Sequence, residues 1–136
     1  MTFIDTNVLI YAVDARDARK QQAAKAIVMG ARNSSDYVIS SQVLNEFSNV
    51  AINKLGKTRL ETRAFVQLFM DIGSIAVCPE WTIQALDIME RYGIQFFDSL
   101  LLAAAESVGC DEILTEDLGD GQIYCGIKAG NPFKGM

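Results

Sequence analysis

Four acidic residues carry the chemistry that this sequence could perform. They are Asp5, Glu46, Asp98 and Asp117, and each stands at the end of a predicted strand or near the start of a predicted helix. Four carboxylates gathered in one place repel one another, so a cluster of them requires a cation. Oxygen ligands alone select a hard ion, which makes magnesium or manganese the expected metal.

The chain contains no histidine. This excludes Ser-His-Asp and Cys-His mechanisms, His-ligated zinc and an imidazole general base, so any catalysis must depend on carboxylates. The net charge of −5 lacks the basic footprint that nucleic-acid-binding proteins usually show. Carboxylates that hold divalent cations contribute to such a charge, however, and a bound metal reverses its local sign. The charge therefore neither favours nor excludes a nucleic-acid partner.

Length and composition predict one compact domain over residues 1–136, because a chain of this size with 50% hydrophobic residues can bury a core. The opening apolar run, residues 3–13, is interrupted by Asp5, has no basic leader and is too short to cross a bilayer. We therefore expect neither a signal peptide nor a membrane span. The three cysteines, Cys78, Cys110 and Cys125, form no Cys-x-x-Cys pair, which favours a reducing, cytoplasmic setting.

The hydrophobic patterns predict strands that alternate with helices. Strands are expected at residues 2–5, 37–40, 74–78, 112–115 and 123–129. Helices are expected at residues 7–13, 16–32, 42–54, 58–72, 80–92 and 97–108, and the last of these is apolar on nearly every side. This alternation predicts an α/β fold, a three-layer α/β/α sandwich with a mostly parallel central sheet.

The places of the four acids in this scheme are informative. Ligands of an open parallel sheet bind outside the carboxyl ends of its strands, and three of the acids fall on that rim. Asp5 ends the first strand, Asp98 lies in the first turn of the apolar helix, and Asp117 follows the strand at 112–115. Glu46 lies just outside the apolar arc of its helix, so we expect it to be half-buried near the rim.

Each acid also has a plain structural interpretation. Asp5 and Asp98 could stabilise helix N-termini, Asp117 could form a turn, and Glu46 could be solvated. Two observations favour a shared site over four separate roles. All four acids occur at corresponding points of the strand–helix scheme, and Asp98 heads the most apolar helix, where a lone carboxylate would be costly without a partner.

Four segments that contain these acids resemble the motifs of PIN-domain nucleases, and of VapC-type toxins in particular. They are residues 3–11 (FIDTNVLIY), 40–47 (SSQVLNEF), 96–105 (FFDSLLLAAA) and 114–118 (LTEDL). The resemblance runs from residue 3 to residue 133. It implies a PIN-like fold in which the four acids are metal ligands or their direct supports, these being Asp5, Glu46, Asp98 and Asp117.

The same resemblance makes Asn7 and Thr115 polar groups that support the ligands. Family members vary after the fourth acid, and here Asp117 is followed by Asp120, so either carboxylate could face the metal. Asp120 is the secondary candidate, because a loop with two glycines often uses an aspartate only for its turn.

The activity implied is metal-dependent hydrolysis of RNA phosphodiester bonds by a toxin of a toxin–antitoxin pair. One or two magnesium ions, which manganese can replace, would be held by Asp5, Asp98 and Asp117, with Glu46 as a further ligand or as the group that orients water. The resemblance also implies an RNA substrate, with transfer RNA as a candidate, a homodimer, and a cognate antitoxin whose tail covers the acidic pocket.

Three other functions compete with this one. A receiver-like signalling domain would need an adjacent acidic pair after the first strand, where Thr6 and Asn7 stand instead. A non-catalytic PIN-like RNA-binding module would lack one or more of the four acids. A metal-dependent phosphatase could use the same site, and a substrate assay separates it from a nuclease.

The densest basic stretch of the chain comprises Lys54, Lys57, Arg59 and Arg63. These side chains could contact phosphate groups of a nucleic acid. A solvated helix face is the alternative interpretation.

Overall fold

The computed structural model describes residues 1–136. Its strands are β1 (Thr2–Ile4), β2 (Tyr37–Ser40), β3 (Gly73–Ile75), β4 (Glu112–Leu114), β5 (Ile123–Tyr124) and β6 (Ile127–Gly130). Its helices are α1 (Thr6–Val13), α2 (Ala18–Arg32), α3 (Ser41–Asn53), α4 (Arg59–Phe69), α5 (Pro79–Tyr92) and α6 (Phe96–Ser107).

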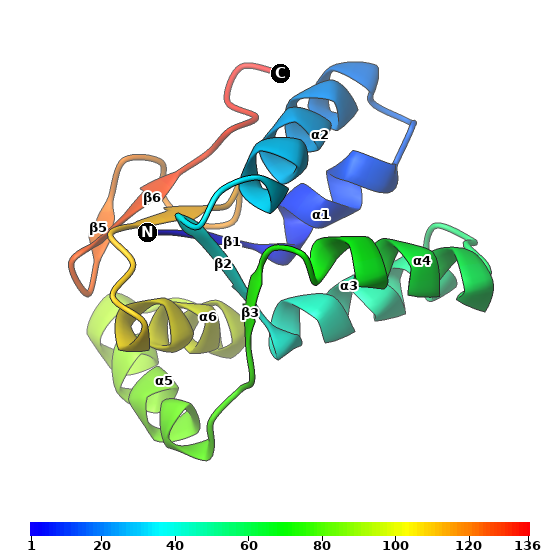
Figure 1. Ribbon diagram of the computed structural model, residues 1–136. Helices are drawn as coiled ribbons and strands as arrows, with labels where there is room; N and C mark the ends of the chain where they lie inside the picture. Colours follow the sequence, from blue (N-terminus) through cyan, green and yellow to red (C-terminus); the bar gives the residue numbers. More distant parts are fainter.

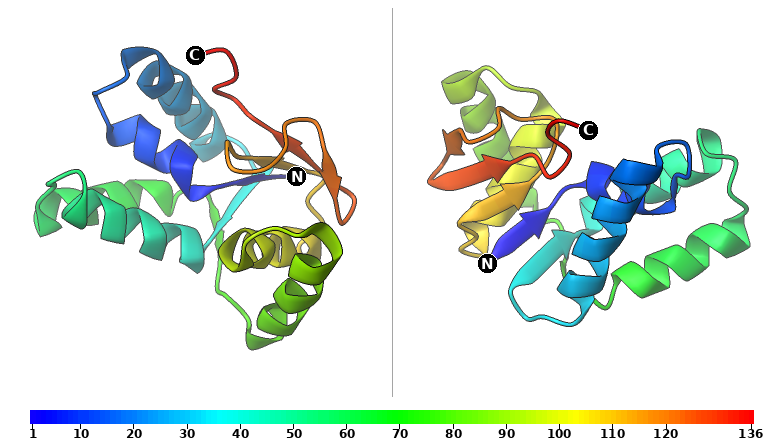
Figure 2. Two further views of the ribbon diagram at one scale, coloured as in Figure 1. Left: turned by 180° about the vertical axis from the view of Figure 1, so that it is seen from behind. Right: turned by 90° about the horizontal axis from the view of Figure 1, so that it is seen from above.

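The six strands form a single sheet in the order β3-β2-β1-β4-β6-β5, and every pairing is parallel except the one between β5 and β6. Helix α2 covers one face of the sheet, and α5 and α6 cover the opposite face (Figures 1 and 2). This arrangement confirms the predicted α/β architecture with a mostly parallel sheet. The centre of the sheet is β1, with β2 on one side and β4 on the other, so the loops after β1 and β4 meet at the same edge.

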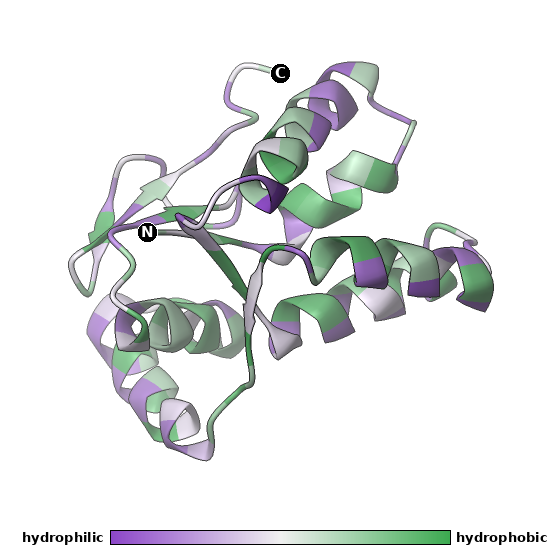
Figure 3. Cartoon of the chain, viewed as in Figure 1, coloured by the Kyte–Doolittle hydropathy of each residue, from purple (hydrophilic) through white to green (hydrophobic).

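The hydrophobic core is one cluster that joins the central strands to the helices on both faces of the sheet, and α6 is its most fully buried helix. Phe3, Ile39 and Ile113 are buried in the sheet, and Figure 3 shows hydrophobic residues along β1 and β2 and over much of α6. Every residue of α6 from Ser99 to Ala105 is buried, as the apolar pattern of this helix predicts. Burial of a leucine such as Leu102 contributes roughly 1.5–3 kcal/mol. The helix is thus held rigidly by its apolar body, and this fixes the position of its first turn.

The end of the chain differs from the prediction of one strand over residues 123–129. The segment folds into a hairpin, β5 followed by antiparallel β6, because the chain reverses at Cys125 and Gly126. These two residues have φ angles of 54° and 76°, the left-handed pair that a tight hairpin turn requires. The sequence Cys-Gly is not the usual signal for such a turn, which is why the pattern indicated a continuous strand.

Strand β3 is also shorter than predicted, ending at Ile75 and not at Cys78. Its only partner is β2, which ends at Ser40 opposite Ile75. Beyond that point the N–H of Val77 donates to the Ser41 hydroxyl at 3.0 Å, so the chain leaves the sheet there. None of the six helices combines the length and hydrophobicity that a membrane crossing demands.

Candidate metal centre

Three of the predicted acids come together at the carboxyl edge of the sheet. Strands β1 and β4 pair in parallel, with Ile4 opposite Leu114, so Asp5 and Asp117 follow adjacent strand ends. Asp98 reaches the same point from the first turn of α6. Carboxylate oxygens of all three residues lie within 4.8 Å of one another. We call this group the carboxylate triad.

Asp5 is the most buried member of the triad, with an exposed fraction of 4%. Its carboxylate caps α1 by accepting from the N–H of Thr6 at 2.6 Å, so its predicted capping role is confirmed. The other oxygen accepts from the Thr115 hydroxyl at 2.7 Å. Burial raises the pKa of Asp5 to about 7; the Thr115 hydrogen bond opposes this rise, and the charge of Asp117 adds to it.

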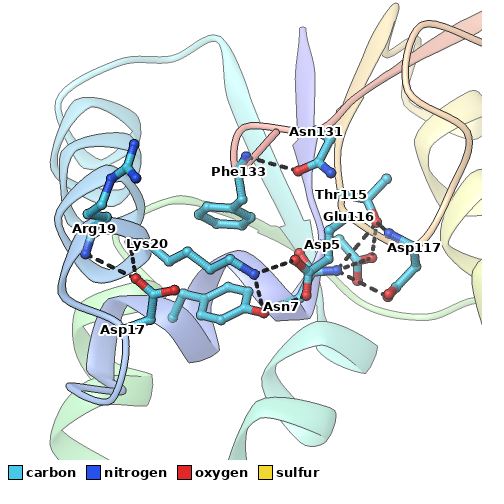
Figure 4. A network of polar contacts seen from close by, with 11 residues as sticks. Asp5, Asn7, Asp17, Arg19, Lys20, Thr115, Glu116, Asp117, Asn131 and Phe133 are labelled. Atoms are coloured by element: carbon cyan, nitrogen blue, oxygen red, sulfur yellow. Dashed lines mark hydrogen bonds and ion pairs between the residues drawn. The ribbon is translucent and has the colours of Figure 1, made fainter. Parts of the chain in front are cut away.

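Asn7 and Thr115 connect Asp5 to Asp117 (Figure 4). The Asn7 side-chain amide donates to Asp5 at 3.3 Å and to Asp117 at 3.1 Å. The Thr115 hydroxyl donates to Asp5 and also accepts from the backbone N–H of Asp117 at 3.0 Å. Both residues therefore contact two of the acids that the resemblance makes ligands. They fix the directions of two carboxylates without adding positive charge.

Asp98 is half-buried and faces two other acids. Burial raises the pKa of Asp98 to about 6, and the negative charges of Asp117 and Glu46 raise it further. The lining of the surrounding pocket contains no lysine or arginine. Full ionisation of the triad is therefore unfavourable unless a cation joins it.

Glu46 lies beside the triad without belonging to it. Its carboxylate accepts from the Thr6 hydroxyl at 2.9 Å and from the Gln42 side-chain amide at 2.8 Å. Gln42 donates at the same time to the backbone carbonyl of Phe97 at 3.2 Å, which ties α3 to the start of α6. Glu46 is half-buried at the rim, as predicted. Two donors hold it in one orientation beside Asp98.

The sequence reasoning missed Thr6 and Gln42. Gln42 lies four residues before Glu46 on the same helix, a spacing that allows side-chain contact, so this signal was present in the sequence. The bond from Thr6 joins residues 40 positions apart and had no such signal.

The triad and Glu46 line one pocket with a volume of about 280 Å³. Its polar lining comes from the acids together with Thr6, Asn7 and Asn49, and its apolar lining includes Ile10 and Val50 on the facing helices α1 and α3. The pocket is open to solvent, so a polymer can reach the carboxylates.

Two acids near the triad are engaged elsewhere. Glu116 accepts from the Tyr11 hydroxyl at 2.7 Å and pairs with Lys20 at 3.5 Å, a contact visible in Figure 4. Asp120, the secondary candidate, accepts from the backbone N–H of Asn131 at 2.8 Å and pairs with Lys134 at 2.9 Å. The structure does not bring Asp120 into the triad or into the pocket.

The donor set of the triad fits a hard divalent cation. All the available ligand atoms are carboxylate oxygens, and no histidine or cysteine is among them. Such a set suits magnesium or manganese better than zinc or copper. The buried side-chain oxygen of Asn7 has no hydrogen-bond partner, which leaves one further polar atom unsatisfied at this site.

The same fold occurs in several solved structures, including three from bacteria. A toxin–antitoxin complex from Klebsiella pneumoniae superposes with a TM-score of 0.73 at 17% identity, covering 98% of this chain and 98% of that chain. VapC20 of Mycobacterium tuberculosis, a sarcin–ricin loop cleaving toxin, superposes with a TM-score of 0.68 at 19% identity, covering 83% of this chain and 87% of that chain. VapBC2 of Rickettsia felis, solved with a DNA fragment from its promoter, superposes with a TM-score of 0.67 at 16% identity, covering 96% of this chain and 97% of that chain.

At these identities the three likenesses establish the fold alone. No curated protein sequence matches the chain. The family comparison is more direct, because the PIN domain model matches residues 2–119 and so includes all four predicted acids. With this match over most of its length, the chain belongs to the PIN domain family.

Proposed function

We propose that this protein is a metal-dependent endoribonuclease and the toxin of a toxin–antitoxin pair, with residues 1–136 forming a single nuclease domain. The observation that carries the proposal is the triad itself: three carboxylates within 4.8 Å of one another, two of them with raised pKa values, in an open pocket without a basic side chain. Such a charge arrangement suits a protein that uses a divalent cation at this point.

Asp5, Asp98 and Asp117 would hold one or two magnesium ions, and manganese would substitute. Bound there, the ion would supply Lewis acidity that acidifies water and offsets negative charge on the phosphate oxygens. The protein's own contribution is orientation. Thr115 and Asn7 fix the Asp5 and Asp117 carboxylates, and α6 presents Asp98 from a rigid body.

Glu46 would act as a further ligand or orient the attacking water. Thr6 and Gln42 donate to its two oxygens, so the carboxylate stays an oriented acceptor at the pocket rim. No side-chain nucleophile is needed for hydrolysis by this route.

The substrate that we propose is RNA, with transfer RNA as the first class to test. The membership of the PIN family and the fold shared with toxin–antitoxin proteins support this choice. A cognate antitoxin would be the protein partner, with its tail over the acidic pocket, and the toxin would act as a homodimer in the cytoplasm.

The direct test is cleavage of a mixed transfer RNA pool by the purified, antitoxin-free protein with magnesium or manganese. Discrete fragments are expected, and they should disappear with a chelator or in an Asp98→Asn variant. The variant keeps the shape of the side chain and removes one ligand charge, so its fold should survive while kcat/KM collapses. A fully active Asp98→Asn protein would refute the assignment.

Substrate controls separate the remaining alternatives. Hydrolysis of phosphate monoesters with intact RNA would indicate a phosphatase, and RNA binding without hydrolysis of either substrate would indicate a binding module. Both results would contradict the proposed nuclease.

A further inference from the structure

Helices α1 and α3 form a seam that begins at the metal centre. They start at the carboxyl ends of the paired strands β1 and β2, and they run side by side away from the sheet (Figure 1). Asp5 caps the start of α1, and Glu46 lies in the first half of α3. The acidic pocket already extends along this seam, because Ile10 lines it about one turn into α1 and Val50 about two and a half turns into α3.

A second hollow lies at the far end of the same seam. It has a volume of about 390 Å³ and is lined by the last residue of α1, by the turn after it and by the turn after α3. With a rise of about 1.5 Å per residue, the eight residues from Glu46 to Lys54 place this hollow about 12 Å from the acidic site. We call it the distal hollow, and its charged lining residues are Asp14, Arg16, Lys54 and Lys57.

The distal hollow carries a net positive charge in a protein whose net charge is −5. Asp14 and Arg16 neutralise each other through an ion pair of 2.7 Å. Lys54 and Lys57 pair with no acid, so two positive charges remain uncompensated there. The metal centre and the distal hollow therefore have opposite charge and are connected along one seam.

From this arrangement we infer that the distal hollow is a phosphate-binding subsite for the substrate strand. A single-stranded RNA lies along the α1–α3 seam, with the bond to be cut at the carboxylate triad and a phosphate some nucleotides away between Lys54 and Lys57. This inference rests on the proposed nuclease function and extends it to substrate binding.

The geometry favours an RNA strand over an acidic segment of a partner protein. A nucleic acid has anionic groups at regular intervals, so one molecule can place a phosphate at the metal centre and another at the lysines. An acidic protein segment could bind the two lysines without contacting the seam or the metal centre.

The test compares two double variants that each remove two positive charges. Lys54→Gln with Lys57→Gln removes the two uncompensated positive charges from the distal hollow. Arg59→Gln with Arg63→Gln is the matched control, because these arginines belong to the same basic stretch but are exposed on α4 and do not line the distal hollow. Thermal melts of both variants show whether the fold is retained.

Both variants are assayed with a single-stranded RNA that the wild-type protein cleaves with magnesium. The lysine variant is expected to raise KM on the order of tenfold with little change in kcat, and to lower the salt dependence of RNA binding by about 0.7 per lost phosphate contact. The arginine variant is expected to retain the wild-type KM and salt dependence.

Substrate length gives a second measurement within the same protein. A dinucleotide is too short to reach from the triad to the distal hollow, so wild-type and lysine variant should cleave it equally well. The two proteins should differ in KM only with longer strands, and only when the added nucleotides extend from the cleaved bond towards the distal hollow. This internal comparison holds even if the lysine variant is less stable.

Two results would overturn the inference while leaving the nuclease in place. In the first, the lysine variant has the wild-type KM with long RNA, or both double variants lose affinity equally. In the second, the lysine variant cleaves RNA normally but loses affinity for polyglutamate, which would assign the hollow to an acidic protein segment. Failure of the proposed function itself looks different, because the wild-type protein would then cleave no RNA of any length.

Discussion

Glu116 and Asp117 are neighbours in the chain, but their carboxylates have opposite electrostatic surroundings. Glu116 accepts from the Tyr11 hydroxyl and pairs with Lys20, so its charge is compensated. Asp117 accepts only from the neutral amide of Asn7 and faces two further acids. The same loop thus carries one acid that pairs with a basic side chain and one acid that does not.

This contrast extends over the molecule. Asp14 and Asp120 each pair with a basic side chain within 4.0 Å, whereas no member of the triad has such a partner. Pairing alone does not mark a structural role, because Asp17 and Glu61 cap α2 and α4 without forming an ion pair. The acids of the candidate site differ in that they are clustered, and two of them have a raised pKa. A cluster of carboxylates without a basic partner, held in a hydrogen-bond network, therefore distinguishes the candidate site from the other acids.

The largest predicted effect on RNA cleavage is the difference between separate substitutions of Asp117 and Glu116. Asp117→Asn should lower kcat for RNA cleavage on the order of a hundredfold or more, because it removes a ligand charge from the triad. Glu116→Gln should lower the melting temperature and change kcat far less, because it weakens only the contacts with Tyr11 and Lys20. Steady-state cleavage rates and thermal melts of both variants test this. Equal losses of kcat would show that the loop acts as a whole.

The metal-free protein should lose stability as the pH rises. Burial holds the pKa of Asp5 at about 7, against 3.8 in the unfolded chain, and Asp98 titrates near 6. The folded state therefore binds more protons between about pH 4 and pH 7, so this contribution is complete below pH 3.8 and is lost as the pH rises through about 7. For Asp5 the loss over the whole range is on the order of 4 kcal/mol.

Chemical denaturation in the presence of a chelator, at about pH 5 and about pH 8, measures this loss. Asp5→Asn is the control, because asparagine still caps a helix but does not titrate, so the variant should show a smaller loss. Magnesium should restore stability to the wild-type protein at the higher pH. The same pH dependence in wild-type and Asp5→Asn would contradict the assignment of this titration to Asp5.

A smaller effect is expected at Glu46. Thr6→Val removes one of the two donors that orient its carboxylate, so kcat should fall roughly tenfold while metal affinity changes little. Thr6→Ser retains the hydroxyl and should restore most of the activity. Equal rates in the valine and serine variants would show that the hydroxyl does not position Glu46.

The smallest effect is expected at Asp120. Its carboxylate contacts the C-terminal segment through Asn131 and Lys134 and does not enter the pocket. Asp120→Asn should therefore leave kcat/KM within about twofold of the wild-type value. A loss of kcat/KM comparable with that of Asp117→Asn would indicate that Asp120 is a metal ligand.

The sequence predicted the individual places of the acids because local rules determine them. Asp5 and Asp117 follow strands, and Asp98 heads a helix whose apolar residues cover every side. These features depend on nearby residues alone, as does the capping of α1 by Asp5. Most strand and helix boundaries agreed closely for the same reason, whereas α4 and β3 ended earlier than predicted and the last strand divided into β5 and β6.

The detailed arrangement of the acids could not be predicted from such rules. It depends on β4 pairing with β1, residues about 110 positions apart in the chain, which no local pattern encodes. The bond from Thr6 to Glu46 and the contact of Lys20 with Glu116 are likewise long-range. The hairpin at Cys125 was missed because an uncommon residue adopts its left-handed turn. The strand–helix scheme placed three of the acids on one rim, and the motif resemblance grouped all four.

Manganese binding is the most direct test of the central claim that the uncompensated triad holds a divalent cation. Calorimetric titration of manganese into the wild-type protein, Glu116→Gln and Asp117→Asn compares the two neighbouring acids by a readout independent of RNA. We predict saturable binding of similar affinity for the wild-type and Glu116→Gln proteins, and an affinity at least about tenfold lower for Asp117→Asn. No saturable binding to the wild-type protein, or the same affinity in Asp117→Asn, would contradict the account.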